Sequence, residues 1–556
     1  MAATSSQIST VFLPTCGDYQ YNVVDVMRNG AAMGNYLNPG NAGLTEIRNA
    51  EYVDKSGLIE LVNRTIRTPQ KLSCMSRPRW FGKSFAAKML CAYYDRSCDS
   101  HDLFDDLAIA QSPTYETHLN KYDVLYVDMT AVIGEVGIGG LINHIKNRIT
   151  EELLQAYPHL KTDPGIMSTL ANAVETSGTQ FFMIVDEWDA PIREASHDAT
   201  FQREYLEFLR LLFKNSAQIP KVFSGAYMTG ILPIKKDHSQ SAVSELQEYT
   251  MVDPLDFAPF IGFLEDEVRR LCERRGGSFE RMRDWYDGYR FPGVDSVYNP
   301  NSVMQALRRK VYRSYWARTS AANNLLEYIR LDYAGLSRTV AELLGGVEVP
   351  VDVDGFSNDL VTFRNKDDVL TLLVHLGYLA YDPERETARI PNEEIRREFQ
   401  RSIKEVDRTE TVARVAASAK LVEDTVHGDE KAVAEGIERV HAEWPSLYYN
   451  TEQALRSTIK LAYFCYADHY LHFEELPAGA GVADIVYLPK RDSPYPALVI
   501  ELKWDISAKG AIDQIRDRDY PRALDGFDGE VLLVGISYDK RAEPGHRTHT
   551  CKIEVA

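Results

Sequence analysis

Two carboxylates and a lysine near the C-terminus have the residue types and spacing needed to hydrolyse a phosphodiester. Asp484 enters one apolar run, and Glu501 and Lys503 end a second run that contains residues 498–500. Because side chains alternate along a strand, Glu501 and Lys503 should share one face. A carboxylate-held magnesium ion neutralises the scissile phosphate and activates water, and a lysine stabilises the developing negative charge. The pattern predicts a nuclease site with Asp484 and Glu501 as metal ligands and Lys503 as a catalytic residue.

Neighbouring residues could complete this site. Gln514 is expected on the following helix, where it would contact phosphate or order the site, so it joins the predicted catalytic residues. Glu475 is a further candidate ligand, and a role outside the site is an open alternative for both side chains. His469 and His472 belong on or just after the preceding helix, and histidines at such positions are more often surface or core residues than metal ligands.

A second group, far upstream, has the chemistry of a nucleotide site. The segment 77–84 ends in Gly82, Lys83 and Ser84, which is the second half of the GxxxxGK[ST] loop, whereas Arg77 stands where the first glycine belongs. Backbone N–H groups of such a loop face phosphates, Lys83 would bind the β and γ phosphates, and Ser84 would offer its hydroxyl to magnesium. A helix N-terminus without a ligand is the alternative.

The other half of this site follows the apolar strand predicted at 181–185. Asp186 would help Ser84 hold magnesium, and Glu187 would activate the attacking water as a catalytic residue. Both halves occur in the expected order and in a strand–loop–helix setting, so together they favour ATP and Mg²⁺ as cofactors more strongly than either half alone.

Other polar residues near these motifs have two interpretations each. Thr229 ends a later strand, where it would sense the γ-phosphate or form an ordinary turn. Arg77 and Arg79 would contact phosphate or remain exposed loop charges. Arg283 and Arg290 are candidates for an arginine finger, although the sequence does not choose between them.

Alternating strands and helices would position the nucleotide residues. Apolar periodicity predicts strands at 71–76, 122–129, 181–185 and 221–229, and helices at 58–67, 82–94, 141–157 and 201–215. This alternation predicts an α/β domain with a mostly parallel sheet. The rest of the chain is predicted as mostly helical over 302–445, with strand-like pieces near 347–356 and 378–390, a long helix at 452–470, strands at 482–488, 496–502 and 529–537, and a helix at 510–524.

Composition and charge restrict the class of protein. The chain has 556 residues, of which 44% are hydrophobic and 26% charged, as in a folded soluble protein of about two to four domains. The seven cysteines form neither a disulfide framework nor a CxxC pattern, and no signal or membrane-spanning run is visible, so a cytoplasmic location without membrane contact is expected. The net charge of −19 restricts nucleic-acid binding to a local basic groove, for which 269–283 or Arg396 and Arg397 are candidates.

From about residue 45 to 540 the chain resembles the bacterial family of AAA-ATPase-like proteins fused to a PD-(D/E)XK nuclease domain. The motifs that carry the resemblance lie at 52–56, 77–84, 185–189, 229–230, 285–289 and 298–300, with Asp484, Glu501, Lys503 and Gln514 near the C-terminus. Several long motifs in the same order make the resemblance specific. It implies ATP binding in the first domain and a restriction-endonuclease-like fold in the last.

The resemblance implies a fold of class α/β in four parts. Residues 1–44 would be an N-terminal extension, 45–300 an AAA-like P-loop ATPase domain, 301–447 a mostly helical linker or lid, and 448–556 a PD-(D/E)XK nuclease-like domain. The family usually has Gly-Arg-x-Asp at the first nuclease motif, and Val482 replaces that arginine here. The change keeps the metal ligands but removes a cation that could contact substrate.

The sequence therefore predicts an ATP-binding and ATP-hydrolysing protein with a Mg²⁺-dependent nuclease domain that acts on DNA, in phage defence or mobile-element control. Two alternatives stay open: a nucleotide-switched scaffold or signalling protein whose nuclease fold only binds nucleic acid, and an RNA nuclease. No base-reading motif is visible, and the aromatic segment 285–289 is favoured as core over a base-stacking surface. The oligomeric state is open, with a homo-oligomer among the alternatives.

Overall fold

The computed structural model of this chain describes residues 34–556 with internal exceptions. The positions left out are 196–197, 215–216, 235, 238–239, 242–244, 317–335, 355, 357–364, 406–408, 443–451, 464–469, 479–480, 491–492, 494, 506, 519, 521–523, 525–526, 528 and 540–548. Most of the predicted N-terminal extension, His469 and the side chain of Glu475 lie outside the described residues.

A five-stranded parallel sheet organises the first half of the chain. Its strand order is β2-β3-β4-β1-β7, and each neighbouring pair is parallel. The strands are β1 (Leu72–Ser76), β2 (Asp123–Asp128), β3 (Phe181–Asp186), β4 (Phe223–Gly230) and β7 (Gln247–Tyr249). The predicted parallel α/β arrangement is confirmed for this part of the chain, and β7 is an additional strand that the sequence did not predict.

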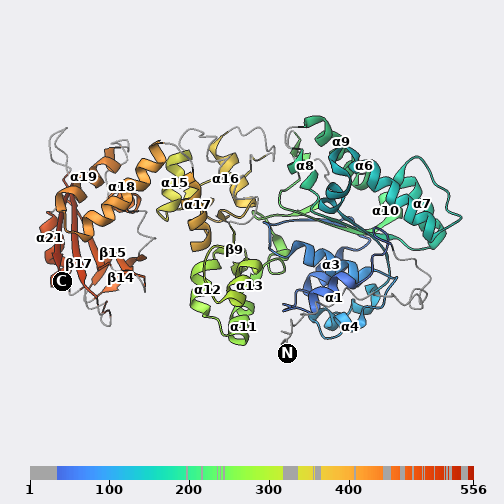
Figure 1. The fold of residues 1–556 in the computed structure, drawn as a ribbon, viewed down its shortest axis with the longest axis horizontal. Helices are drawn as coiled ribbons and strands as arrows, with labels where there is room; N and C mark the ends of the chain where they lie inside the picture. The colour runs from blue at the N-terminus through green and yellow to red at the C-terminus, as the bar shows by residue number, and fades with distance from the viewer. Residues whose placement is uncertain are drawn as a thin grey trace, which may run out of the picture.

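Helices cover both faces of this sheet (Figure 1). Side chains alternate along β3, so Phe182 and Ile184 pack with α3 on one face, whereas Phe181 and Met183 pack with α6, α7 and α9 on the other. The helices are α1 (Ala42–Arg48), α2 (Gly57–Thr65), α3 (Lys83–Tyr94), α4 (His101–Phe104), η2 (Ala108–Gln111), α5 (Tyr115–His118), α6 (Met129–Ala156), α7 (Ile166–Ser177), α8 (Ala190–Glu194), α9 (Ala199–Phe213) and α10 (Ile219–Val222).

A small unit of helices and short strands follows β7. Its three-stranded sheet has the order β8-β10-β9. The elements are η3 (Leu255–Phe257), β8 (Phe263–Leu264), α11 (Glu265–Arg275), α12 (Phe279–Tyr286), β9 (Tyr289–Phe291), β10 (Val294–Tyr298) and α13 (Pro300–Arg309), preceded by the pair β5 (Lys236–Asp237) and β6 (Gln240–Ser241). Tyr286 and Tyr289 are 0% and 1% exposed, so the core role favoured for the aromatic segment is confirmed for these two residues.

The middle of the chain is mostly helical, as predicted, with a second small sheet in the order β11-β13-β12. Its elements are α15 (Leu336–Leu344), β11 (Val349–Pro350), α16 (Lys366–His375), β12 (Ala380–Asp382), β13 (Thr387–Arg389) and α17 (Glu393–Glu405). The largest hydrophobic cluster runs from Leu44 to Phe399, so residues on both sides of the predicted boundary at 300 share one core. The four domain bounds stay a prediction.

A mixed five-stranded sheet forms the C-terminal part, at the opposite end of the molecule from the first sheet (Figure 1). Its order is β14-β15-β16-β17-β18; β16 and β17 are parallel, and the other neighbours are antiparallel. The strands are β14 (Tyr470–Ala478), β15 (Gly481–Pro489), β16 (Ala497–Trp504), β17 (Val531–Tyr538) and β18 (His549–Val555).

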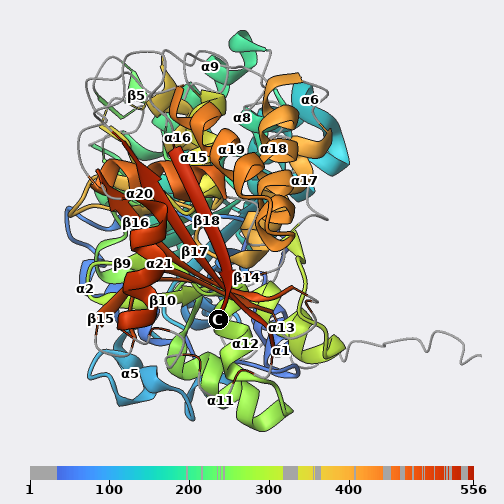
Figure 2. The same cartoon turned by 90° about the vertical axis from the view of Figure 1, so that its left-hand side faces the viewer.

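Helices also cover this second sheet from two sides. Helix α21 (Ala508–Asp517) connects β16 to β17 and lies in front of the strands in Figure 2. Helices α18 (Thr409–Val426), α19 (Glu430–Ala442) and α20 (Glu452–Ala462) share a separate core with the sheet. Two helices expected in the linker therefore pack against the C-terminal strands.

Differences from the predicted elements include the bounds of two helices and one strand that was not predicted. The helix expected from residue 141 begins at Met129, because the glycine-rich stretch continues it with one break at Gly137 (φ 68°). The helix predicted to reach residue 470 is wrong at its end, since Tyr470 begins β14. Strand β18 was not predicted, because it mixes polar with apolar residues and so has a weak apolar signal. Among the described residues, no helix has both the length and the apolar character required to cross a bilayer.

Candidate functional site

One cavity of about 680 Å³ lies at the carboxyl edge of the first sheet. Parallel strands end at a common edge, and there Asp128 of β2 stands beside Asp186 of β3. Lys83, Ser84 and Glu187 line the same cavity, as do both of these aspartates. A cavity of this size suits a drug- or nucleotide-sized ligand. The structure thus brings together the two motif halves that the sequence separates.

The loop between β1 and α3 presents a helix N-terminus to the cavity. Gly82 precedes the helix with φ 96°, a left-handed conformation that glycine adopts at little cost. The side chain of Lys83, 3% exposed, donates to the carbonyl oxygen of Pro78 at 3.1 Å and lies 3.5 Å from Oε1 of Glu187. Ser84 follows in the first helical turn and is half-buried. Unpaired N–H groups and an ammonium at one point suit an anionic ligand.

Asp186 is held from two sides. It is 2% exposed; Oδ2 accepts the hydroxyl of Tyr126 at 3.1 Å, and Oδ1 accepts the hydroxyl of Thr229. Thr229 also accepts the N–H of Glu187 at 3.1 Å. Thr229 is fully buried behind these acids and does not line the cavity, so the predicted γ-phosphate contact is wrong for this arrangement. Its side chain orients the two acidic residues instead.

Glu187 sits among three cations. Burial opposes its charge, but Lys83, Arg193 and Arg79 outweigh burial and hold the pKa of Glu187 below its ordinary value. Arg193 donates to Oε2 of Glu187 at 2.7 Å and to Oδ2 of Asp189 at 3.1 Å. Glu187 adopts φ 53°, which is uncommon for a residue with a side chain and often accompanies function. An ionised carboxylate in this position can accept a proton from water.

Arg77 does not face the cavity. Its side chain is fully buried, donates to the carbonyl oxygen of Thr250 at 2.6 Å and packs over the ring of Phe291 at 4.9 Å. Burial lowers the pKa of Arg77 to about 9. The phosphate-contact interpretation of Arg77 is therefore wrong, whereas Arg79 lines the cavity as expected.

The other basic candidates lie away from this cavity. Arg283 and Arg290 are exposed, and neither lines it. Within the predicted basic groove, Arg269 and Arg397 each pair with a glutamate at i,i+4 spacing, and Arg396 donates to a backbone carbonyl oxygen of α15. These three arginines, which were predicted to bind nucleic acid, therefore already have partners within the protein.

The cavity residues that were not predicted include two charged ones, Asp128 and Arg193. Asp128 ends β2 as Asp186 ends β3, and burial raises its pKa. Asp128 could have been predicted from the sequence, because it ends an apolar strand, and this is the pattern that identified Asp186. Arg193 could not have been predicted in this way, since only the fold places α8 beside the end of β3.

Apolar residues form another part of the cavity lining, called here the apolar wall. Residues of the 52–56 and 298–300 motifs contribute to it. These two motifs carry no catalytic group, and their place in the cavity lining gives them a role. Lys55 holds this region together through an ion pair with Glu267 at 2.7 Å and a hydrogen bond to the carbonyl oxygen of Pro259 at 2.8 Å. The apolar lining includes Tyr52, Val53, Phe260, Phe263, Pro300 and Met304.

The predicted C-terminal residues also come together. Lys503 lies 2.8 Å from Oε1 of Glu501, and Gln514 of α21 donates to the same oxygen. Glu501 is 2% exposed; burial raises its pKa, and its Oε2 has no hydrogen-bond partner within the described part of the chain. Asp484 is adjacent, since Asp484 Oδ2 accepts the N–H of Leu502 at 2.8 Å.

Arg456 is an additional member of this group that was not predicted. From α20 it donates to Oδ1 of Asp484 at 2.7 Å, so both oxygens of that carboxylate accept a hydrogen bond. Val482, where the family carries arginine, is 48% exposed. A helix residue thus supplies a cation next to Asp484. His472 lies elsewhere on β14, near Glu474, and burial lowers its pKa to about 4.

Comparison with known proteins bears on the first cavity. A protein-family model described as "AAA-ATPase_like: Predicted AAA-ATPase" matches residues 44–239. No curated protein matches the chain.

Solved structures with partial similarity have low scores. They include ORC2 of Aeropyrum pernix in ADPNP–ADP complexes, at 12% identity and TM-score 0.31, covering 64% of this chain and 96% of that one. A signal transduction ATPase with a tetratricopeptide repeat sensor from Pyrococcus horikoshii has 11% identity and TM-score 0.24, covering 74% and 50%. ORC1 of Aeropyrum pernix in complex with DNA has 10% identity and TM-score 0.24, covering 69% and 100%. Similarity at these scores carries no conclusion about this chain.

The family match covers most of the cavity lining, and the remaining lining residues lie between 260 and 304. The matched residues include the Gly82-Lys83-Ser84 loop, Asp186 and Glu187, and these side chains line one cavity. Residues 44–239 are therefore similar to the AAA-ATPase-like family, and the match supports ATP binding by this part of the chain.

Proposed function

We propose that the chain binds ATP with Mg²⁺ in the cavity beside Lys83 and hydrolyses it. The observation that carries this proposal is the convergence of four residues of the matched segment on one cavity of about 680 Å³, namely Lys83, Ser84, Asp186 and Glu187. The loop N–H groups and Lys83 would bind the phosphates, and the apolar wall around Tyr52 would hold the base.

The oxygen donors present fit magnesium. Ser84 offers a hydroxyl and Asp186 a carboxylate whose orientation Thr229 fixes, and Mg²⁺ prefers such oxygen ligands. When bound, Mg²⁺ neutralises charge on the phosphates. Glu187 would orient the attacking water and accept its proton, while Arg79 and Arg193 add positive charge near the transferred phosphoryl group.

The C-terminal group supports a second activity, Mg²⁺-dependent cleavage of DNA. Glu501 and Asp484 provide oxygen donors, and the buried Oε2 of Glu501 without a hydrogen-bond partner in the described part of the chain fits a metal ligand. Lys503 would orient the water and stabilise negative charge, and Gln514 would hold Glu501 in position. Phage defence or mobile-element control in the cytoplasm is the setting in which an ATP-controlled nuclease would act.

One observation favours the alternative of a nucleotide-switched protein that binds nucleic acid without cutting it. Arg456 occupies Oδ1 of Asp484, so a metal ion must compete with a resident cation for that carboxylate. In that case ATP would change the assembly or conformation of the chain, and the C-terminal sheet would serve as a binding surface.

Nucleotide binding is tested by calorimetry of the full chain with ATP and Mg²⁺. Lys83→Ala should weaken binding at least about tenfold, because it removes a charged hydrogen-bond donor. Lys88→Ala, a lysine on the same helix outside the cavity lining, is the matched control and should bind like the wild type. Equal affinity in Lys83→Ala would contradict the proposed site.

Cleavage is tested with circular double-stranded DNA, single-stranded DNA and RNA, each with Mg²⁺ and with or without ATP. Cutting of DNA that is lost in Glu501→Gln supports the nuclease. Cutting of RNA alone would identify an RNA nuclease, and binding of either nucleic acid without cutting would support the scaffold alternative.

A further inference from the structure

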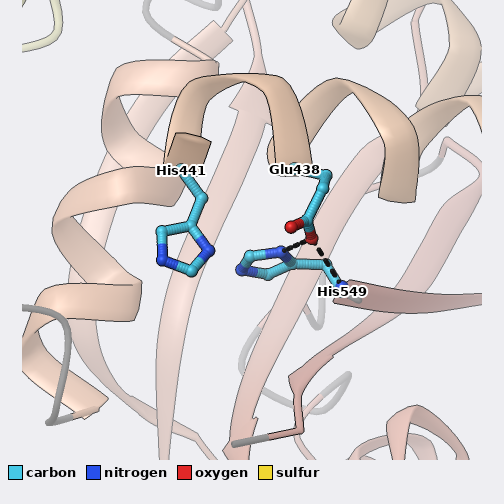
Figure 3. A group of neighbouring side chains, drawn as sticks. All are labelled: Glu438, His441 and His549. Atoms are coloured by element: carbon cyan, nitrogen blue, oxygen red, sulfur yellow. Dashed lines mark hydrogen bonds and ion pairs between the residues drawn. The ribbon is translucent and has the colours of Figure 1, made fainter. Parts of the chain in front are cut away.

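A third cluster of chemically active side chains lies where α19 meets β18, outside both groups described above (Figure 3). Its members are Glu438 and His441 of α19 and His549, the first residue of β18. One potential ligand atom from each of the three lies within 4.8 Å of the other two. In the described part of the chain, no other group of three histidine, cysteine or acidic residues converges in this way.

The geometry of the cluster is fixed by regular secondary structure. Glu438 and His441 are one helical turn apart and so project from one face of α19. Oε2 of Glu438 accepts both the backbone N–H of His549, at 2.9 Å, and its Nδ1, at 2.6 Å. These two contacts hold the His549 ring in place from both its backbone and its side chain.

The two imidazole rings face each other. Their centroids lie 5.0 Å apart with the ring planes at 90°. Figure 3 shows a nitrogen of each ring on the side toward the other ring, with the Glu438 carboxylate beside them. One nitrogen of His549 therefore lies toward His441, while its Nδ1 contacts the Glu438 carboxylate.

Both imidazole rings are shielded from water. The His549 side chain is 0% exposed and His441 is 9% exposed. The ring of Tyr538 stands 5.0 Å from each of the two imidazoles and covers the cluster. The Glu438 side chain is 36% exposed, so the two imidazoles are the shielded members of the cluster.

We propose that Glu438, His441 and His549 bind a divalent transition-metal ion, with Zn²⁺ as the best match. Two imidazole nitrogens and one carboxylate oxygen are a donor set that zinc takes readily, with a fourth position left for water. Magnesium and calcium prefer all-oxygen sites and so do not fit it. Bonds to zinc of about 2.0–2.2 Å require the ligand atoms to approach one another more closely than 4.8 Å, a change within reach of side-chain rotations.

The metal would fasten an edge strand to a helix. At the other end of α19, Glu430 accepts the Lys552 ammonium at 2.9 Å and the N–H of Ile553 at 3.1 Å. Strand β18 is thus tied to α19 at two points, and the metal strengthens the one nearer the start of the strand. The role proposed for the metal is to hold β18 against α19, and this role is independent of the nucleotide cavity.

The test uses the full-length chain stripped of metal, titrated with Zn²⁺ and separately with Co²⁺ in excess Mg²⁺ and without nucleotide. We expect a single tight Zn²⁺ site, a rise in Tm on binding, and the visible absorption of four-coordinate Co²⁺ with nitrogen ligands. His441→Gln and Glu438→Gln should each weaken Zn²⁺ binding at least about tenfold. His427→Gln is the matched control, since His427 is an exposed histidine at the end of α18.

Circular dichroism checks that each variant folds, and His441→Gln is the informative variant if His549 substitutions do not fold. Zn²⁺ affinity and Co²⁺ absorption that persist unchanged in His441→Gln and Glu438→Gln would overturn the proposal. So would the absence of tight Zn²⁺ binding in the wild type. Binding that is lost in Glu501→Gln but kept in His441→Gln would place the metal in the other carboxylate group and would also overturn it.

Discussion

Thr229 donates its hydroxyl proton to Asp186 while the same oxygen accepts the N–H of Glu187. One fully buried side chain on β4 therefore sets the orientation of the two acids that end β3. The acid pair is fixed by a residue that cannot touch the ligand, because Thr229 does not line the cavity.

Replacing Thr229 with valine should impair hydrolysis more than binding. The isosteric change removes a hydrogen bond to a charged group, worth about 1.5–3 kcal/mol, and leaves Asp186 with one hydroxyl partner instead of two. We expect a roughly tenfold or larger fall in kcat for ATP, with Kd changed far less. Thr169→Val, a buried threonine of α7, is the control; an equal fall in kcat there would contradict a specific role for Thr229.

Removing Arg193 should destabilise the protein. Asp189 is fully buried and accepts Arg193 Nε at 3.1 Å, so Arg193→Ala leaves a buried charge without its cation. The expected loss in the free energy of unfolding is about 3–5 kcal/mol. Urea denaturation measures it, with Arg64→Ala, which removes an exposed surface pair with Glu60, expected to lose less than about 1 kcal/mol. If both variants lost the same free energy of unfolding, the buried pair of Arg193 with Asp189 would be worth no more than a surface pair, and the prediction would be wrong.

Because of Glu394, the free energy of unfolding should fall as pH rises. Burial raises the pKa of Glu394 from an ordinary 4.5 to about 8, with Glu398 adding to the shift, although Tyr315, Ser302 and Trp316 donate hydrogen bonds that oppose it. The folded chain therefore holds a proton more tightly than the unfolded chain. The stabilisation is complete below pH 4.5 and is lost as pH rises through about 8.

Glu394→Gln should flatten this decline, since an amide keeps the acceptor and carries no proton to lose. The full effect is of order 5 kcal/mol at most. Urea denaturation from about pH 5 to 9 measures it, and Glu393→Gln, the same change at the neighbouring position, should keep the decline. A wild-type chain equally stable across this range would contradict the buried, protonated state of Glu394.

Lys503→Ala and removal of divalent metal should each abolish DNA cutting. Lys503 contacts Glu501 directly, and loss of a catalytic group of this kind lowers rates by about 10²–10⁴-fold. Lys509→Ala, an exposed lysine on α21, should cut like the wild type. Cutting that survives EDTA or Lys503→Ala would exclude the proposed metal-dependent chemistry at this site.

The sequence predicted the acids and the phosphate loop because both occur at the ends of apolar strands, where local pattern and position coincide. Gly82, Lys83, Asp186 and Glu187 line the cavity or border it as expected. Asp128 could have been found by the same rule. Arg193 could not, because only the packing of α8 against β3 brings it to Glu187.

Errors arose where tertiary packing decides what a residue does. Arg77 belongs to a loop whose charges look exposed, yet its side chain enters the core and meets Phe291. Arg456 lies on a helix with no motif, and its link to Asp484 joins segments far apart in the chain. The pairing of α19 with β18 could not be predicted either, because strand β18 itself was not predicted from the sequence.

Hydrolysis of ATP by Glu187→Gln tests the central claim most directly. The amide keeps the size of Glu187 but cannot accept a proton from water, whereas Lys83 and the phosphate loop remain intact. We expect ATP to bind with near wild-type affinity and kcat to fall by about 10²-fold or more, while Glu194→Gln, an exposed acid at the cavity edge, keeps its kcat. Hydrolysis by Glu187→Gln at the wild-type rate would contradict the proposed ATPase site.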